Sequence, residues 1–152
     1  MRRVNETLTA IGTADEHFAQ FTPDNEPPHL AFYNDTSHAL LTGRPLADLA
    51  ILGRDASEAT DRLTTAAAHT ASNIRGRAIC LTKLGSLTMA TGDPIQAAAI
   101  GHDALDAAGT LRSRGVTDLL RELAHYAATH QHLDEVAHLR HRIATLVCTD
   151  SP

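Results

Sequence analysis

Histidines gather toward the C-terminal end of the sequence, and histidine is a common metal ligand that titrates near neutral pH. Of the ten in the chain, the group in question comprises His125, His130, His132, His138 and His141. His138 and His141 are three residues apart on one expected helix, with Asp134 one turn earlier, so their side chains share a face. No further Cys or carboxylate completes a known ligand spacing, and surface histidines of a helix explain the pattern without an ion. We therefore expect no metal site and leave open a pH response through His125 or this group.

The sequence gives still less support for a catalytic nucleophile or a nucleotide-binding site than for a metal site. Cys80 and Cys148 are far apart, and Cys80 falls inside an expected helix on its packing side, which is typical of a buried thiol. The sequence contains neither a glycine-rich phosphate loop nor a Gly-x-Ser-x-Gly elbow. We expect no enzymatic activity and no cofactor.

Composition predicts an all-α protein. The chain has 152 residues, of which 43% are hydrophobic but only 3% aromatic. Its apolar residues are mostly Ala and Leu, which suit close helix packing, and the β-branched alternation of strands is nearly absent. The formal net charge of −5 argues against direct binding to nucleic acid. No apolar run is long enough for a membrane span and no signal peptide is recognisable, so we expect a cytoplasmic protein without membrane contact.

The helices that must position these side chains are marked by glycine, proline and capping residues. We expect a first helix over residues 4–20 and a proline-rich joint, together forming an N-terminal part over 1–27, and then a helical domain over 28–152. In that domain Gly43-Arg44-Pro45 should separate a helix over 29–41 from a short one over 46–52. Asp55 or Ser57 and then Asn73 can cap the next two helices, to about residues 70 and 91. Gly92-Asp93-Pro94 is a strong joint, and further helices follow over about 94–109, 113–130 and 132–147.

These expected helices recur at a constant interval. A shift of 39 positions, the separation of Gly53 and Gly92, also places Leu84 on Leu123 and Ala97 on Val136. The repeating unit is therefore a helix–turn–helix of about 39 residues.

The middle unit resembles a tetratricopeptide repeat. It reproduces the spacing of that family's Leu-Gly, Gly, Ala and Ala-Leu positions with Leu84-Gly85, Gly92, Ala97 and Ala104-Leu105. It differs from the family at three positions. Leu81, Thr88 and Gly101 stand where the family usually has Trp, Tyr and a large aromatic residue, respectively. The resemblance implies a right-handed superhelix of about three helix–turn–helix units, preceded by an N-terminal helix.

A longer pattern over residues 28–147 is similar to the C-terminal, tetratricopeptide-like half of actinobacterial helix-turn-helix transcriptional regulators. It includes Tyr33-x-Asp35, Gly43, Arg75-x-Arg77-Ala78 and Ser113-x-Gly115. In those proteins this half is thought to sense a ligand or to mediate dimerisation. No DNA-reading domain is recognisable in this sequence, so the resemblance implies a separated sensor-like domain, a truncated member of the family or a relative with another task. If the chain acts on transcription, we expect it to do so through a fused or separate DNA-binding partner.

In the tetratricopeptide register, the first helix of each unit directs one stripe of side chains toward a concave face. The stripe of the middle unit contains Arg75, Ile79, Thr82, Ser86 and Met89. The stripe of the last unit contains Arg114, Asp118, Arg121, His125 and Ala128. The arginines of these stripes can hold a carboxylate or phosphate, such as an acidic segment or the C-terminal carboxylate of a peptide. The alternative is a solvated wall in which Asp118 offsets the arginines.

A weaker second site is predicted where Tyr33, Asp35 and His38 lie within two helical turns, with packing of the same residues as the alternative. Taken together, these features predict a non-enzymatic module that binds a protein, peptide or signal, with a regulatory role. The alternative is a structural or dimerisation scaffold. It rests on an apolar stripe of the last helix that either packs back on its partner helix or pairs with a second chain: Leu133, Val136, Leu139, Ile143 and Leu146.

Overall fold

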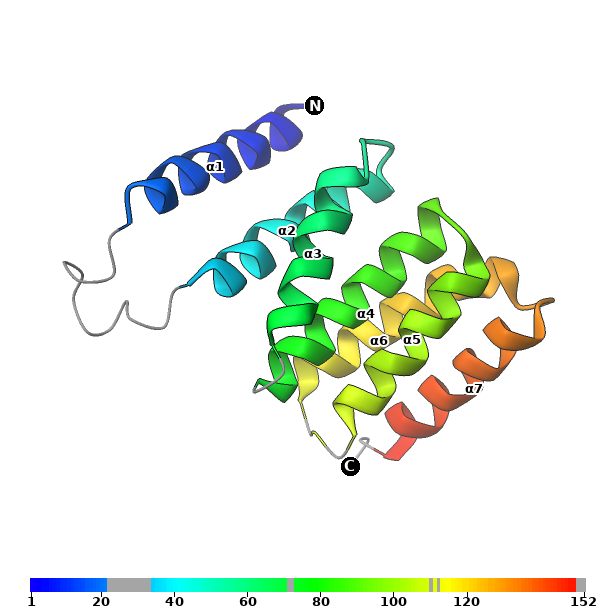
Figure 1. Ribbon diagram of the computed structural model, residues 1–152. Coiled ribbons are helices and arrows are strands. Elements are labelled where there is room, and N and C mark those ends of the chain that lie inside the picture. Colours follow the sequence, from blue (N-terminus) through cyan, green and yellow to red (C-terminus); the bar gives the residue numbers. More distant parts are fainter. Residues whose placement is uncertain (22–33, 71–72, 110, 112, 150–152) are drawn as a thin grey trace.

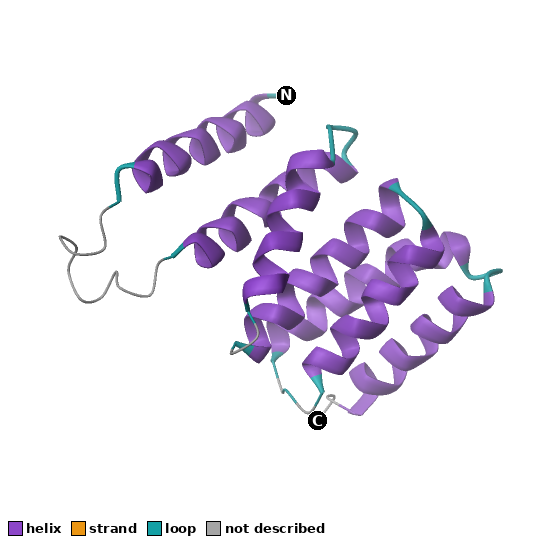
Figure 2. Cartoon of the chain, in the orientation of Figure 1, coloured by secondary structure: helices purple, strands orange, loops and turns teal. Residues whose placement is uncertain are grey.

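The structure is a computed structural model that describes residues 1–21, 34–70, 73–109, 111 and 113–149. Over these ranges it contains helices and no strand (Figure 1; Figure 2), which confirms the all-α prediction. The helices are α1 (Arg2–Ala19), α2 (Asp35–Ile51), α3 (Ser57–His69), α4 (Ile74–Thr91), α5 (Pro94–Ala108), α6 (Arg114–Ala127), the 3₁₀ helix η3 (Ala128–His130) and α7 (Asp134–Thr149).

Capping residues fix several helix starts where the sequence predicts them. The side chain of Asn73 accepts a hydrogen bond from the Gly76 amide at 2.9 Å at the start of α4. Asp93 accepts one from the Ile95 amide at 2.9 Å, and Pro94 is the first residue of α5, where its missing N–H costs nothing. These signals act within one turn, so the sequence alone is sufficient to find them.

The predicted interruption at Gly43-Arg44-Pro45 is wrong, because α2 runs through it without a break. Pro45 deprives the helix of one backbone hydrogen bond. Packing against α3 outweighs this loss: Gly43 is buried, and a methyl group at its position would lie 3.2 Å from Leu63 Cγ. Leu46, directly after the proline, is buried as well. Tertiary burial therefore overrides a local helix-breaking signal.

From α2 onward the helices form successive hairpins: α2 with α3, α4 with α5, and α6 with α7 (Figure 1). α4 also packs against α2 and α6, and α5 packs against α7. Leu84 and Ala97 are buried in the α4–α5 hairpin, as Leu123 and Val136 are in the α6–α7 hairpin. The 39-residue sequence repeat is thus a repeat of helix hairpins.

α4 is the central helix of the molecule, with α2, α3, α5 and α6 all in contact with it. Its residues 80–87 are buried without exception. Because a helix completes a turn in 3.6 residues, an unbroken run of more than two turns means that every face is covered. This enclosure decides which predicted site residues are accessible.

Lys83, the only lysine of the chain, lies in this buried run with its side chain 4% exposed. Its ammonium donates to Asp48 Oδ1 of α2 at 2.5 Å and to Glu122 Oε1 of α6 at 2.8 Å. Burial disfavours the charged form, but the hydrogen bonds to the two carboxylates outweigh it and raise the pKa of Lys83. One buried cation therefore ties α4 to both neighbouring helices.

The apolar stripe of α7 packs inward. Val136, Leu139 and Ile143 are buried in a cluster that includes α5 and α6, and Leu133 and Leu146 pack against it. Of the two alternatives left by the sequence, the structure supports packing within the chain. Among the described residues, no helix combines the length and the apolar character that crossing a membrane requires.

Candidate binding groove

The side chains predicted to line one concave face do not share an accessible surface. On α4, Thr82 and Ser86 are 0% and 1% exposed, so a ligand cannot touch them. The prediction is therefore wrong for Thr82 and Ser86. Helices α2 and α6 pack against α4 and cover the face that we expected to be open. Thr82 Oγ1 donates to the Ala78 carbonyl at 2.6 Å, whereas the buried Ser86 hydroxyl has no partner among the described residues.

The remaining predicted residues of α6 form one exposed face: Arg114, Asp118, Arg121 and His125. Arg121 donates to Asp118 at 2.9 Å, and both side chains are more than half exposed, so solvent screens the pair. Arg75 of α4 is exposed and lies beside the first turn of α6, where a methyl group at Gly115 would be 4.0 Å from its Nη2. The structure therefore brings Arg75 to the start of this face.

The predicted second site is described only in part, because Tyr33 lies outside the described residues. Asp35 is the exposed first residue of α2. His38 is buried and its Nε2 donates to Asp15 of α1 at 2.7 Å. Arg62 of α3 holds the same carboxylate through hydrogen bonds of 2.9 and 2.7 Å. His38 thus helps to hold α1 in place.

The Asp15 carboxylate should make the docking of α1 sensitive to acid. Hydrogen bonds from Arg62, opposed by burial and aided by His38, hold the pKa of Asp15 below its usual 3.8. Because folding lowers this pKa, the ionised Asp15 carboxylate stabilises the docked position of α1 above pH 3.8. That stabilisation is lost as pH falls through the lowered pKa.

We expect the amide NMR signal of Gly12 in α1 to shift as pH falls below 3.8 and through the lowered pKa of Asp15, because Asp15 then releases Arg62. Glycine-selective labelling measures this shift, which should be absent from the Asp15→Asn variant. The signal of Gly101 in α5 reports on the core. If the Gly12 and Gly101 signals changed together, the acid response would be general unfolding and not release of α1.

A hollow of about 250 Å³ lies between α3 and α5, with α4 as its floor. Its lining consists of hydroxyl, amide and apolar side chains: Thr60, Thr64, Leu84, Thr88, Thr91, Gly92, Gln96 and Ile100. Thr88 and Thr91 donate to carbonyls of their own helix at 2.9 and 2.7 Å. Their oxygen lone pairs remain as acceptors. This end of the α3–α5 space is neutral and suited to hydrogen bonding.

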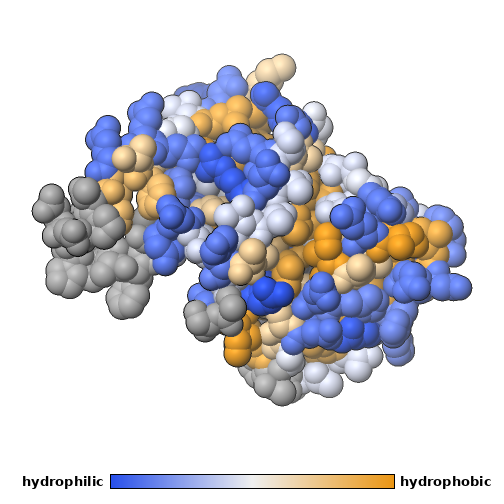
Figure 3. Space-filling model, in the orientation of Figure 1, coloured by the Kyte–Doolittle hydropathy of each residue, from blue (hydrophilic) through white to orange (hydrophobic). Residues whose placement is uncertain are grey.

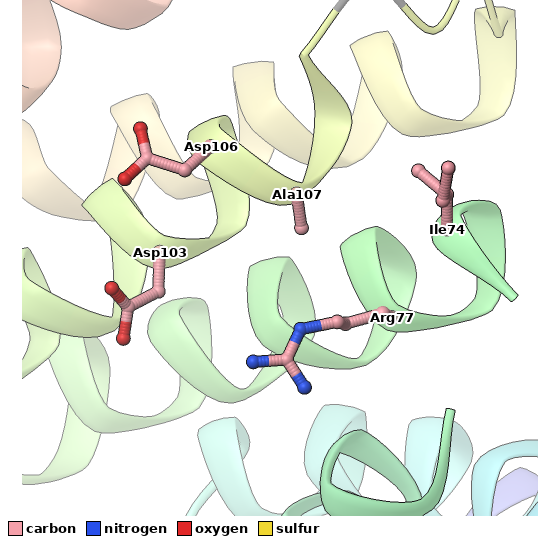
Figure 4. A pocket seen from close by; sticks show the side chains of 5 residues that line it. All are labelled: Ile74, Arg77, Asp103, Asp106 and Ala107. Carbon is pink, nitrogen blue, oxygen red and sulfur yellow. The ribbon is translucent and has the colours of Figure 1, made fainter. Parts of the chain in front are cut away.

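A second hollow, of about 270 Å³, lies at the other end of the α4–α5 pair and is lined by Ile74, Arg77, Asp103, Asp106 and Ala107 (Figure 4). Arg77 extends from α4, and the two carboxylates are carried by α5. Arg77 Nη1 donates to the Ala67 carbonyl at 2.8 Å, so α3 borders this end as well. Asp106 accepts a hydrogen bond from Arg142 of α7 at 2.8 Å. Among the described residues, Asp103 takes part in no ion pair.

The two hollows lie along one face of α4. Their α4 residues, with Leu81 between them, follow at intervals of three and four, which keeps them on one stripe: residues 74, 77, 81, 84, 88 and 91. Leu81 is 8% exposed and is covered between the two hollows, whereas Leu84, 7% exposed, lines the neutral one. In the face drawn in Figure 3, hydrophobic residues run through the middle of the molecule with hydrophilic residues around them. We call these two hollows, together with the stripe of α4 between them, the α3–α5 groove; the stripe spans about 25 Å by helix rise.

The thiol nearest to this groove is not a nucleophile. Cys80 of α4 is fully buried, as predicted, and burial raises its pKa to about 11. A thiol with that pKa is protonated at neutral pH and unreactive. Within the described ranges, no group of three or more His, Cys, Asp or Glu side chains is placed to hold a metal ion.

The histidines near the C-terminus do not gather at one point, and two of the five lie next to each other. The ring of His138 lies 5.0 Å from that of His102, and His130 lies 6.5 Å from His132. Arg142 Nη1 donates to His102 Nδ1 at 2.9 Å, so this ring accepts a hydrogen bond in its neutral form. Burial, followed by the charges of Arg142 and His138, lowers the pKa of His102. Sequence reasoning missed His102 because it stands on a different helix from its partners.

Comparison with protein-family models, with curated proteins and with solved structures finds no match for this chain. The resemblance to tetratricopeptide regulators therefore stays a prediction from residue spacing. The case for function rests on the geometry and chemistry of the groove.

Proposed function

We propose that this chain is a non-enzymatic binding module that holds an extended segment of a partner protein in the α3–α5 groove. The observation that carries the proposal is the pair of hollows along α4: one is lined by hydroxyl, amide and apolar side chains, and the other by Arg77, Asp103 and Asp106 beside apolar residues. The repeated hairpins support it, since stacked helix pairs present extended binding surfaces. The resemblance to regulator sensor domains favours a regulatory role in the cytoplasm.

The chemistry of the groove suits a peptide main chain. An extended peptide advances about 3.3 Å per residue, so a segment of roughly seven residues would reach from one hollow to the other. Its backbone N–H and C=O groups need partners when they leave water, and Thr60, Thr64 and Gln96 offer both donors and acceptors. Apolar side chains of the segment contact Leu84 and Ile100 in the neutral hollow. Arg77 and Asp103 at the charged end give the bound segment a direction.

Blocking the groove should abolish peptide binding. Thr64 is an exposed groove residue of α3, and Thr65 is its exposed neighbour outside the groove. We expect peptides selected on the wild-type chain from a random phage-displayed library to lose at least about tenfold in affinity for Thr64→Arg, about 1.4 kcal/mol. Thr65→Arg is the matched control and should bind as the wild type does. Fluorescence polarisation with the selected peptides measures both.

The same peptides distinguish the groove from the arginine face of α6. If Arg114→Ala or Arg121→Ala weakens binding and Thr64→Arg does not, the ligand lies on the α6 face, and acidic peptides or a C-terminal carboxylate become the expected ligands. A library that yields no binder at all would contradict the peptide-binding proposal.

A further inference from the structure

α1 is attached to the rest of the molecule by a narrow contact. It packs mainly against α2, and Ile11 is its only buried residue, whereas most residues of α4 are buried. Its inward face follows the spacing of an amphipathic helix, with Thr7, Ile11, Ala14 and Phe18 on one stripe. A helix held by so little burial leaves its place at low cost.

The surface beneath α1 is apolar. Ile11 belongs to a cluster with Leu46, Ala47 and Ala50 of α2 and with Leu63 of α3. Phe18 covers the neighbouring part of α2, where its ring stacks on that of His38 at 4.3 Å with an interplanar angle of 6°. If α1 left, this apolar floor would be open to another helix of the same pattern.

A carboxylate receptor stands beside the apolar floor. Arg62 binds Asp15 with both of its terminal nitrogens, the forked geometry that is specific for carboxylates. Its guanidinium also donates hydrogen bonds to Thr42 Oγ1 of α2 and, at 2.6 Å, to Glu58 Oε1 of its own helix. His38 adds a third donor to Asp15. Because the anchors of Arg62 lie on α2 and α3, the receptor does not need α1 to keep its shape.

We propose that the face of α2 and α3 under α1 is a docking site for an acidic amphipathic helix of a partner protein, and that α1 occupies this site until the partner displaces it. The partner helix carries an Asp or Glu four residues after an apolar anchor, as α1 does with Ile11 and Asp15. This surface lies apart from the α3–α5 groove and does not depend on the function proposed for it.

A labelled peptide with the sequence of residues 1–21 tests the proposal on the full-length chain. In an Asp15→Asn chain the internal helix is weakened while Arg62 and His38 stay intact. We expect the peptide to bind this chain about tenfold more tightly than the wild type, because a weaker internal competitor raises the open fraction. The same chain with Thr64→Arg added should bind the peptide equally well, which separates this surface from the groove.

Two peptide variants show whether the carboxylate receptor is used. The Asp15→Asn peptide should bind at least about tenfold more weakly to the Asp15→Asn chain, whereas the Glu16→Gln peptide, altered at the adjacent exposed carboxylate, should bind as the unmodified peptide does. Equal affinity of the Asp15→Asn and Glu16→Gln peptides would overturn the proposal. So would the absence of peptide binding to every chain, since α1 would then be a fixed part of the fold.

Discussion

Replacing Lys83 with alanine should lower the free energy of unfolding by about 3 kcal/mol. The substitution removes the cation between Asp48 and Glu122 and leaves a cavity where the aliphatic stem of the lysine packs. The Asp48 side chain is 60% exposed, so water stabilises part of the charge that is left behind. The loss therefore falls at the lower end of the range for a broken buried pair.

Chemical denaturation followed by circular dichroism measures this loss. Arg121→Ala is the control, because the Arg121–Asp118 pair is exposed and its removal should change stability by less than about 0.5 kcal/mol. Lys83→Met keeps the packing of the stem, so it should recover about 1 kcal/mol of the alanine loss. If Lys83→Ala costs no more than Arg121→Ala, the buried cation does not hold the three helices together.

The features of the fold that the sequence predicted are those set by local chemistry. The cap at Asn73 and the Gly92-Asp93-Pro94 joint depend on residues within one turn, and the structure has them as expected. The break at Pro45 was predicted by the same local reasoning and is wrong, because α3 packs against that turn of α2. Local signals therefore place helix ends reliably except where burial from another helix competes with them.

The site was harder to predict because it depends on contacts between distant segments. The periodicity placed Thr82 and Ser86 on one stripe correctly, but it could not show that neighbouring helices cover this stripe. The α3–α5 groove joins residues such as Thr64, Thr88 and Gln96 from separate helices. A usable signal was the threonines spaced three or four apart on helices otherwise rich in Ala and Leu.

The Lys83 bridge also left a trace in the sequence. The 39-residue shift that defines the repeat places Lys83 on Glu122, so equivalent positions of neighbouring units carry opposite charges. First helices of neighbouring units lie side by side in a stacked array, which puts such positions within reach of each other. Lys83 is the only lysine of the chain, and the repeat aligns it with the carboxylate of Glu122. This alignment indicates a contact between α4 and α6.

Gly101→Ala should destabilise the protein by about 2 kcal/mol, although alanine favours helices more than glycine does. A methyl group at Gly101 would lie 2.7 and 2.8 Å from the two terminal carbons of Leu139 and 3.3 Å from Leu123. Both leucines are fully buried, so neither has free space to move into. Leu139 of α7 therefore occupies the space that a side chain at position 101 would need.

Gly85→Ala is the matched comparison, because Gly85 is also a buried helical glycine that faces Leu123. Its methyl group would meet that leucine at 3.5 Å, an ordinary contact, and the repeat has Ala124 at the equivalent position. We expect this variant to be neutral or more stable by up to about 1 kcal/mol. Adding Leu139→Val to Gly101→Ala should restore part of the stability lost, because the shortened side chain makes room for the new methyl group. If thermal and urea unfolding gave the same sign for the two glycine variants, or no coupling with Leu139, close approach of α5 and α7 would not be the reason that residue 101 is glycine.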